Sequence, residues 1–550
     1  MDLVDTLIKF DEEELKKFIP KELKLYLPNL ISKKDTISYI AKNIEKFLDE
    51  KAFVVLLLLK LSTFVDITAI KDKIAFVNGV TTLESKKHLL SFLGLKYGTE
   101  KIQIETEIDK LGEKRFFELL DYQYLIKEKV VNFVSDSIES GTHINKMIIH
   151  MPTGTGKTKT SVHTIISLYE KNNNKGIIVW LAHTEELLQQ AKNAFVSAWG
   201  AIGNKKIKII YNDVSKVYEN DTIYFMSYQK LISFYKTGYD AYKVFRTNLS
   251  ICVCDEAHKC LAQETYYALD DFMISYDEKH PKTLLGLTAT PGRKYKDSLL
   301  EGDNLELAMM FDKHIFSIKT GELRIFRNFN DNYNFDQFTY KDIFKKDDEI
   351  IKYFQNRHVL AKIIRVPLMF NDEECSIDFE RILSKKRNVD FSADELKIIG
   401  NNIKRNEKIL DMLKKLDSRG IPTILFACSN EQGQLLSDVL TLNGIKNNCV
   451  FGDTKQALRR KYLKDFDDGK YNILINNAIL TTGFDSPRIK CVFITRPTNS
   501  IVLYSQMLGR GLRGKMMGGN DECLLIDVVD NLNKFNNEDF AFNYFSVYWR

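Results

Sequence analysis

Residues 146–158 read Lys146-Met147-Ile148-Ile149-His150-Met151-Pro152-Thr153-Gly154-Thr155-Gly156-Lys157-Thr158, and an amphipathic helix is expected from Lys159 to Tyr169. The apolar run that ends at His150 predicts a buried strand, so the glycine-rich segment is a loop between a strand and a helix. Gly154 and Gly156 allow such a loop, which includes Thr153 and Thr155, to wrap closely around phosphate oxygens. In this setting Lys157 neutralises the β and γ phosphates and the Thr158 hydroxyl ligates Mg²⁺.

A second motif supports this interpretation of the loop. Met151 stands where the strict phosphate-loop pattern has a glycine, and a glycine-rich turn that binds nothing is the alternative. However, the apolar stretch 251–254 leads directly into Asp255-Glu256-Ala257-His258. A lone pair of adjacent carboxylates is common on protein surfaces, but after a buried strand and a preceding phosphate loop it indicates more than a solvated charge pair. We expect Asp255 to hold Mg²⁺ through water and Glu256 to orient and deprotonate the attacking water.

Short apolar strands alternate with amphipathic helices around these motifs, which predicts an α/β protein with parallel sheets flanked by helices. Strands are expected at 146–150, 177–181, 222–226, 251–254 and 283–287, and in a second series at 423–427, 472–475, 491–495 and 523–528. Residues 1–115 are mainly helical, with amphipathic stretches at 10–19, 37–48 and 85–95. The predicted organisation is a helical accessory domain at 1–115, a first lobe at 116–297, a linker or insertion at 298–350, and a second lobe at 351–550 with a C-terminal helix.

Composition is that of an ordinary globular protein and does not identify a partner. The 550 residues carry a net charge of +5, which neither demands nor excludes nucleic acid. The N-terminus shows no secretory pattern, and the apolar run 52–59 is too short to cross a bilayer and predicts a buried helix. The eight cysteines show no C-x-x-C spacing, so reduced core thiols are favoured over a metal site or disulfides. We therefore expect a cytoplasmic protein that does not associate with membranes.

Further motifs stand in a fixed order around the loop and identify a family resemblance. In the first lobe they are Leu120–Gln123, Leu181–Leu187, Ser227–Gln229 and Thr288–Pro291. In the second lobe they are Ile424–Ser429, Thr481–Pro487 and Gln506–Arg513, the last reading Q-x-x-G-R-x-x-R. With these motifs, residues 118–530 resemble the superfamily 2 helicases of the DEAH/DExH-box kind, closest to the restriction-subunit (type I/III Res-like) and RadD-like branch.

The resemblance implies two tandem RecA-like lobes that close on ATP and Mg²⁺. It assigns Tyr122 and Gln123 to the adenine base, with the Gln123 amide at the base edge, and it places Gly483 and Asp485 in the nucleotide site. Catalytic roles are implied for Gln506, Arg510 and Arg513. The spacing of the two arginines predicts that they share one face of a helix, from which an arginine could stabilise the transferred phosphoryl group. Contacts with the nucleic-acid strand, or coupling to it, are implied for His183, Thr184, Ser227, Tyr228, Gln229, Thr288, Thr290, Ser429 and Thr481.

The function implied is that of an ATP-dependent helicase or translocase, acting on DNA rather than RNA in repair, restriction or defence against foreign DNA. We find no nuclease constellation, so cleavage would need a separate subunit, for which residues 1–115 are a candidate docking region. A nucleotide-gated clamp or sensor that recruits such a partner without unwinding would use the same residues and stays an alternative. Strandedness of the substrate, polarity and oligomeric state are left open. The aromatic tail 540–550 is expected to pack as a final helix against the second lobe, and base stacking is its alternative role.

Overall fold

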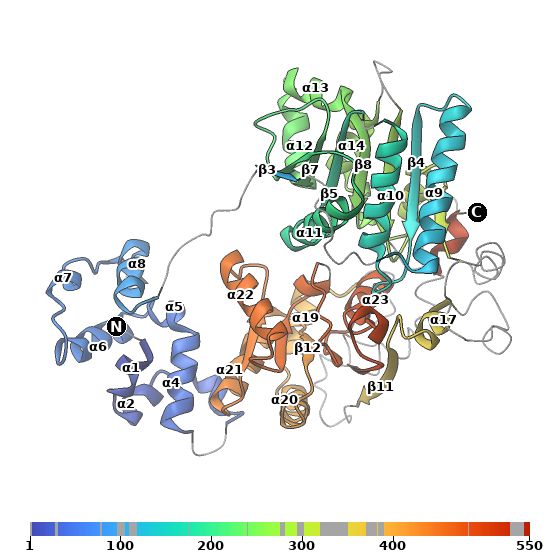
Figure 1. Ribbon diagram of the computed structural model, residues 1–550. Helices are drawn as coiled ribbons and strands as arrows, with labels where there is room; N and C mark the ends of the chain where they lie inside the picture. Colours follow the sequence, from blue (N-terminus) through green and yellow to red (C-terminus); the bar gives the residue numbers. More distant parts are fainter. Residues whose placement is uncertain are drawn as a thin grey trace. The chain divides into compact units, whose positions relative to one another are not determined.

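The computed structural model describes residues 3–27, 31–77, 80–95, 105–108, 118–173, 175–238, 240–274, 281–293, 302–318, 350–369, 382, 390–481, 483–528 and 544–549. It divides into two compact units (Figure 1). Unit 1 comprises Met1–Lys101, Phe370–Lys385 and Ser392–Ile479, and unit 2 comprises Ile102–Met369, Lys386–Phe391 and Leu480–Arg550. Each unit is described separately below.

The larger sheet lies in unit 2 and has eight strands in the order β10-β4-β9-β8-β5-β7-β6-β3. Among the described strands of this sheet, only β3 runs antiparallel, pairing with β6, and the remaining pairs are parallel. The bounds are β3 Glu105–Ile108, β4 Ile144–His150, β5 Ile177–Ala182, β6 Ile207–Tyr211, β7 Thr222–Ser227, β8 Leu249–Asp255, β9 Lys282–Thr288 and β10 Ile315–Ser317. All residues of β5, β8 and β9 are buried, as expected for parallel strands covered on both faces.

The helices of this part of unit 2 connect the strands as the alternating pattern predicts. They are α9 Asp121–Glu139, α10 Lys157–Lys171, α11 Glu185–Ile202, α12 Tyr228–Thr237, α13 Asp240–Thr247, η1 Ala257–Leu261, α14 Gln263–Met273 and α15 Asp303–Met310. Helix α10 packs between α9 and α11, while α12 packs against α13 and α14 (Figure 1). The predicted α/β class with parallel sheets is confirmed.

The first sheet extends further along the chain than the sequence indicated. Residues 302–318 fall in the segment that we expected to connect two lobes, yet they form α15 and the edge strand β10, which pairs with β4. Strand β10 is short and half-buried, so it lacks the continuous apolar run by which a central parallel strand is recognised. The rest of the predicted linker lies outside the described residues.

Unit 2 also contains three parallel strands in the order β11-β16-β15, where β11 is Lys362–Leu368, β15 is Cys491–Ile494 and β16 is Glu522–Val528. Helix α17 (Ile350–Asn356) precedes β11, and α23 (Ile501–Gly509) and η5 (Lys515–Met517) lie between β15 and β16. Strand β11 was not predicted, because its sequence KIIRVPL contains an arginine and a proline and much of it is half-buried or exposed.

Unit 1 joins the N-terminal helices to a second parallel arrangement. Strands β12 Thr423–Phe426, β14 Ile473–Asn476 and β13 Asn447–Val450 follow the order β12-β14-β13. Their helices are α19 Ala393–Gly400, α20 Ile403–Ser418, α21 Asn430–Leu442, α22 Gln456–Asp467 and η4 Ile479–Thr481, whose last two residues belong to unit 2. The N-terminal elements are α1 Leu3–Ile8, α2 Glu12–Lys16, α3 Lys21–Lys24, α4 Lys33–Lys42, α5 Ile44–Phe47, α6 Lys51–Ser62, α7 Thr68–Lys71, β1 Phe76–Val77, β2 Val80–Thr81 and α8 Leu83–Phe92.

One expectation for this helical region needs correction. The apolar run 52–59 forms α6, but only one side of this helix is buried, because Val55 is 40% and Leu59 60% exposed. Phe53 packs against Phe18 and Phe47, which gives the region a small aromatic core of its own. Among the described residues, no helix has both the length and the apolar character needed to span a membrane.

Polar contacts join α4 to α21 within unit 1. The partly buried amine of Lys42 donates hydrogen bonds to the Ser437 hydroxyl, the Thr441 hydroxyl and the side-chain oxygen of Asn447, at 2.6, 3.2 and 2.8 Å. The side chain of Asn43 donates to Asp438 at 3.0 Å. Burial lowers the pKa of Lys42, so the three acceptors compensate for part of the desolvation of its amine.

The C-terminal tail packs differently from the expectation. Residues Tyr544–Trp549 form the 3₁₀ helix η6, which packs against α15, and the Trp549 indole N–H donates to the Pro291 carbonyl at 2.8 Å. The described part of the tail therefore contacts the segment that follows β9 and helix α15. Phe545 is fully buried against Gly292. Indole and ring groups so enclosed are unavailable for stacking on bases in this arrangement.

Gly292→Ala is expected to lower the free energy of unfolding by about 1–3 kcal/mol, because the new Cβ would lie 2.1 Å from the Phe545 ring. Urea unfolding of unmutated protein, Gly292→Ala, Phe545→Ala and the double variant forms a double-mutant cycle. The cost of Gly292→Ala should largely disappear in the Phe545→Ala background. An equal cost in both backgrounds would show that the tail does not pack on Gly292 in solution.

Candidate functional site

The glycine-rich loop lies between β4 and α10, as the sequence predicts. Gly154 and Gly156 have φ angles of 87° and 83°, a left-handed backbone that residues with a Cβ rarely adopt. The Thr155 hydroxyl is turned inward and donates to the Pro152 carbonyl at 2.8 Å. Met151, which replaces the pattern's first glycine, is fully buried and its N–H donates to the Thr288 carbonyl of β9. This position therefore anchors the loop to the neighbouring strand and needs no glycine.

The start of α9 supports the loop from behind. The Gln123 amide nitrogen donates to the Thr155 carbonyl at 2.9 Å, and the Tyr122 hydroxyl donates to the same carbonyl at 2.8 Å. The Gln123 side-chain oxygen accepts the N–H of Leu120 at 3.0 Å. A Cβ on Gly156 would lie 2.3 Å from the Gln123 nitrogen, which is a second reason for glycine there. In this structure the Gln123 amide binds the loop and the helix start, so its predicted role at the base edge stays a prediction.

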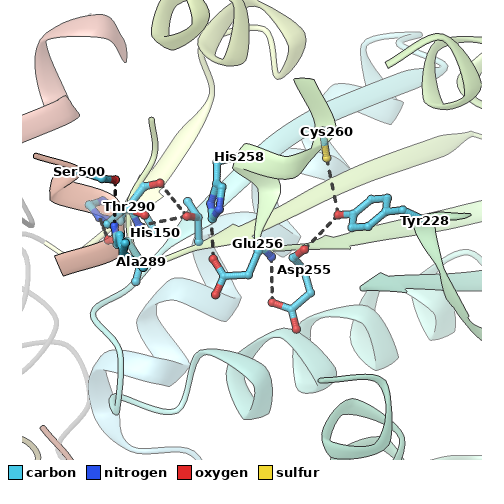
Figure 2. A network of polar contacts seen from close by, with 11 residues as sticks. His150, Tyr228, Asp255, Glu256, His258, Cys260, Ala289, Thr290 and Ser500 are labelled. Atoms are coloured by element: carbon cyan, nitrogen blue, oxygen red, sulfur yellow. Dashed lines mark hydrogen bonds and ion pairs between the residues drawn. The ribbon is translucent and has the colours of Figure 1, made fainter. Parts of the chain in front are cut away.

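The two adjacent carboxylates lie at the end of β8. The Tyr228 hydroxyl donates to the Asp255 carbonyl at 3.0 Å, and the Glu256 N–H donates to the Asp255 carboxylate at 3.0 Å (Figure 2). Burial, only partly opposed by Lys157, raises the pKa of Asp255 to about 7. Glu256 has a left-handed φ of 56°, an uncommon conformation for this residue type that directs the chain into η1.

Cations determine the protonation state of Glu256. Burial favours the protonated form, but Lys157 and then His258, His183 and Arg510 hold the pKa of Glu256 below its ordinary value. The His258 ring nitrogen lies 3.5 Å from the Glu256 carboxylate (Figure 2). Burial lowers the pKa of His258 to about 4, so near pH 7 the ring is neutral and the positive charge that acts on Glu256 comes from Lys157 and Arg510. Glu256 is therefore an ionised carboxylate in a buried site, as a general base requires.

The residues that follow β4 and β9 form the next part of the network. The His150 ring nitrogen lies 3.2 Å from the Ala289 carbonyl, and burial lowers the pKa of His150 to about 3 (Figure 2). The Thr288 hydroxyl donates to the Thr290 carbonyl at 2.8 Å and accepts the Thr290 N–H at 3.0 Å. These bonds form a tight turn directly beside the glycine-rich loop, since Met151 is bonded to Thr288.

Arg510 and Arg513 reach this site, but they do not share a helical face. Helix α23 ends at Gly509, and Arg513 instead forms an isolated antiparallel bridge with Leu360. Gly511 explains the early end of the helix, because a Cβ there would lie 2.3 Å from the Cys523 sulfur, so the chain passes in close contact with β16. The expectation of one helical face was wrong for that reason.

The two arginines have different partners. The Arg510 guanidinium donates to the carbonyls of Phe484 and Gln506, and it contributes to the lowered pKa of Glu256. Arg513 forms an ion pair with Asp485 at 2.6 Å. The side chain of Gln506 is nearly buried. A Cβ on Gly509 would lie 2.7 Å from the Thr153 methyl, so the end of α23 touches the glycine-rich loop directly.

Several other residues that were predicted to contact the nucleic-acid strand lie at the ends of helices. Thr184 caps α11, and a Cβ on Gly483 would lie 3.0 Å from its hydroxyl, so these two motifs touch. Ser227 caps α12, where Gln229 is exposed. Thr481 is buried at the end of η4.

Two further residues are placed as follows. His183 is half-buried and contributes to the charge environment of Glu256. Ser429 caps α21 and lies in unit 1, so it is the one predicted strand contact that belongs to the other unit.

Sequence reasoning missed Arg357, Leu360 and Met517. Arg357 binds Asp121, Leu360 packs on Gly154, and the Met517 methyl lies 3.3 Å from the position of a Cβ on Gly156. These residues belong to no motif with a recognisable spacing. Only local sequence features could have pointed to them. Residues 350–360 precede a strand that was not recognised, and residues 514–519, immediately after Arg513, are rich in glycine.

Comparison with known proteins matches two parts of the chain. Residues 116–293 match the family described as type III restriction enzyme, res subunit, and residues 404–515 match the helicase conserved C-terminal domain. The protein of Saccharomyces cerevisiae described as "Putative ATP-dependent helicase IRC3" is 26% identical over 420 residues, which are 75% of this chain and 51% of that protein. "Putative mitochondrial ATP-dependent helicase irc3" of Schizosaccharomyces pombe is 24% identical over 398 residues, which are 71% of this chain and 54% of that protein.

The chain thus spans about half the length of these two curated relatives. Among solved structures, a fragment of an HsdR subunit of a type I restriction enzyme from Vibrio vulnificus is similar, with 21% identity and a TM-score of 0.47. The similarity covers 76% of this chain and 66% of that chain.

Proposed function

Because the chain belongs to the superfamily 2 helicases of the restriction-subunit kind, we propose that it hydrolyses ATP and couples hydrolysis to movement along a nucleic acid. Lys157 and the loop N–H groups would bind the β and γ phosphates. Glu256 would accept a proton from the attacking water, and Arg510 would stabilise the charge that develops on the transferred phosphoryl group.

Arg510 supports this proposal most strongly. It lies in the segment that matches the helicase C-terminal domain, while Glu256 lies in the segment that matches the restriction res subunit. Arg510 nevertheless contributes to the lowered pKa of Glu256, and the neighbouring Gly509 touches Thr153 of the phosphate loop. An arginine, an ionised carboxylate and a phosphate-binding loop in one buried site are the groups that phosphoryl transfer to water requires.

The chain's own residues fit a magnesium ion. Asp255 and Thr158 offer oxygen ligands beside the phosphate loop, which are the ligands that Mg²⁺ prefers. The Asp255 carboxylate is buried with a raised pKa, so a divalent cation would favour its ionised form. Among the described residues, no group of three or more His, Cys, Asp and Glu side chains could hold a metal by itself. This agrees with an ion that takes most of its ligands from phosphates and water. When bound, Mg²⁺ would neutralise charge on the phosphates.

Movement would follow from the loss of contacts on hydrolysis. Lys157 and Arg510 would both act on the γ-phosphate, so their attraction to it favours a closed site only while the phosphate is present. Thr184 and Gly483, which touch each other, join two motifs whose family counterparts contact the strand. A change at Arg510 can therefore reach the predicted strand contacts through residues 483–485.

We propose DNA as the substrate and the cytoplasm as the location. The match of residues 116–293 to a restriction enzyme subunit supports DNA, and a role in restriction, repair or defence with a separate nuclease partner would follow from the same relationship. Six of the seven described cysteines are buried, as core thiols of a reducing compartment would be.

ATP turnover with single-stranded DNA, duplex DNA and RNA compared in parallel tests this proposal. We expect DNA to stimulate turnover more than RNA, and stimulation to decrease steeply with salt because the strand contacts are mostly to phosphates. Strand-displacement and triplex-displacement assays then separate unwinding from translocation. Stimulation by DNA without displacement in either assay would identify a clamp or sensor instead, and stronger stimulation by RNA would contradict the choice of DNA.

A further inference from the structure

Residues 353–361, which we name the strap, run from α17 to the start of β11 and contact three motifs of the nucleotide site. The strap is held along the chain segment after α23 by backbone hydrogen bonds. Ala361 N–H donates to the Leu512 carbonyl at 2.9 Å, and Gly514 N–H donates to the Val359 carbonyl at 2.9 Å. The strap and the arginine motif therefore form one backbone-bonded element within unit 2.

The first contact is a buried ion pair. Arg357 donates to both carboxylate oxygens of Asp121 at 2.7 Å, and the same guanidinium nitrogen also donates to the Tyr353 hydroxyl. The Asp121 side chain is only 4% exposed and that of Arg357 20%. Asp121 is the first residue of α9, so Arg357 fixes the position of the helix end that carries Tyr122 and Gln123.

The second contact passes from that helix end to the phosphate loop. The Phe354 ring packs edge-on against Tyr122 with 4.9 Å between the ring centroids. Tyr122 and Gln123 both donate to the Thr155 carbonyl. Arg357 is thus linked to the phosphate loop through the start of α9. It binds Asp121, and the next two residues, Tyr122 and Gln123, bind the Thr155 carbonyl.

The third contact reaches the other side of the loop. The Leu360 methyl lies 3.2 Å from the position of a Cβ on Gly154, and the Arg513 nitrogen lies 3.6 Å from it. Leu360 also forms the antiparallel bridge with Arg513. Leu360 therefore sets the distance between the phosphate loop and the arginine motif, while Arg357 sets the position of the helix that supports the loop.

We propose that Arg357 is a positioning residue for the nucleotide site. Through Asp121 it holds the start of α9, and with it the phosphate loop, in register with Arg510 and Arg513, although it touches no nucleotide itself. This role rests on the proposed function. Because a displacement of about 1 Å at a catalytic group can cost about 10²-fold in rate, loss of the Arg357–Asp121 pair should be visible in ATP binding and turnover.

The alternative is an ordinary stabilising ion pair, and unit 2 offers a matched control for it. Arg246 donates to Asp271 at 2.7 Å and is 16% exposed, so it resembles Arg357 in distance and in exposure of the arginine, while Asp271 is 24% exposed. Its surroundings are Tyr242 and Lys282, and the helix that carries it, α13, packs against α12. Arg246→Gln therefore removes a comparable ion pair without affecting the strap.

The experiment compares Arg357→Gln, Arg357→Lys and Arg246→Gln with the unmutated full chain, at a temperature well below the lowest Tm. Three quantities are measured: Tm, the Kd of a fluorescent non-hydrolysable ATP analogue, and kcat and KM for ATP. We expect similar losses of Tm for Arg357→Gln and Arg246→Gln, but a fall in kcat/KM and in analogue affinity of about 10- to 100-fold for Arg357→Gln alone. Arg357→Lys should recover part of this loss, because lysine keeps the charge but cannot contact both oxygens and Tyr353 in the same way.

Equal kinetic effects of Arg357→Gln and Arg246→Gln, or none in either, would overturn the proposal. Should Arg357→Gln not fold, the comparison of Arg357→Lys with Arg246→Gln decides by the same criterion. If the unmutated chain binds the analogue but does not hydrolyse ATP, the proposed function has failed, and the strap is judged on analogue affinity alone. If the unmutated chain binds no nucleotide, both proposals have failed.

Discussion

Lys157→Ala is expected to abolish nucleic-acid-stimulated ATP hydrolysis while the fold is retained. Lys157 is the first residue of α10, directly after the left-handed Gly156, so its amine is presented beside the phosphate loop. It is also the first cation that lowers the pKa of Glu256. Its loss would remove both the charge that neutralises the phosphates and the main cation that keeps Glu256 ionised. We expect turnover to fall at least about 10²-fold, the usual cost of losing one preorganised electrostatic contact.

Lys171→Ala is the matched control, because Lys171 ends the same helix and its amine contacts only the exposed side of Ser135 among the bonds described. Turnover should be unchanged in this variant. A steady-state phosphate-release assay measures both proteins, and circular dichroism checks that they are folded. Turnover that persists in Lys157→Ala would refute the assignment of the nucleotide site.

Arg510→Ala is expected to lower kcat about 10³-fold or more, with a much smaller change in nucleotide affinity, as for arginines that stabilise phosphoryl transfer in other hydrolases. The effect should exceed that of Arg513→Ala, since Arg513 is paired with Asp485 whereas Arg510 acts on Glu256. Turnover and analogue affinity of the two variants are compared side by side. Equal losses of affinity and turnover in Arg510→Ala would contradict this role for Arg510. A larger kinetic effect of Arg513→Ala would assign the role to Arg513 instead.

The dependence of kcat on pH provides a second test of the role of Arg510. Glu256 works as a base when ionised, and Arg510 is one of the groups that hold its pKa below the ordinary value. Removing this positive charge raises the pKa of Glu256. The acidic limb of the kcat profile should therefore move to higher pH in Arg510→Ala, and a profile that keeps its position would show that Arg510 does not act on Glu256.

The central strands of the fold were predictable because burial on both faces demands continuous apolar runs. The runs before His150, Asp255 and Thr288 all form such strands, and each leads into a predicted motif of the site. Edge strands follow a weaker rule. Strand β10 has three half-buried residues and β11 includes Arg365 and Pro367, so neither has a pattern that separates it from a loop.

Contacts between distant segments were beyond the reach of local patterns. The spacing of Arg510 and Arg513 predicts one helical face, but the close approach of Gly511 to Cys523 ends the helix between them. Likewise, no sequence rule pairs Arg357 with Asp121, which are 236 positions apart. The tail was misplaced for the same reason, since its partner Pro291 lies 258 positions from Trp549. The site residues themselves stay predictions until the variants are measured.

The Lys42 contacts bear on how this chain could have changed during evolution. The Lys42 amine donates to Ser437, Thr441 and Asn447, and these three side chains are also bonded to one another, Ser437 to Asn447 and Asn447 to Thr441. The buried amine depends on this polar group to compensate for its desolvation. Exchange of the N-terminal helices for another domain would take the Lys42 amine away from the polar side chains of α21. Further substitutions on α21 would then be needed to compensate for its loss. The accessory helices are therefore bonded into unit 1 through α4 and do not form a separate module.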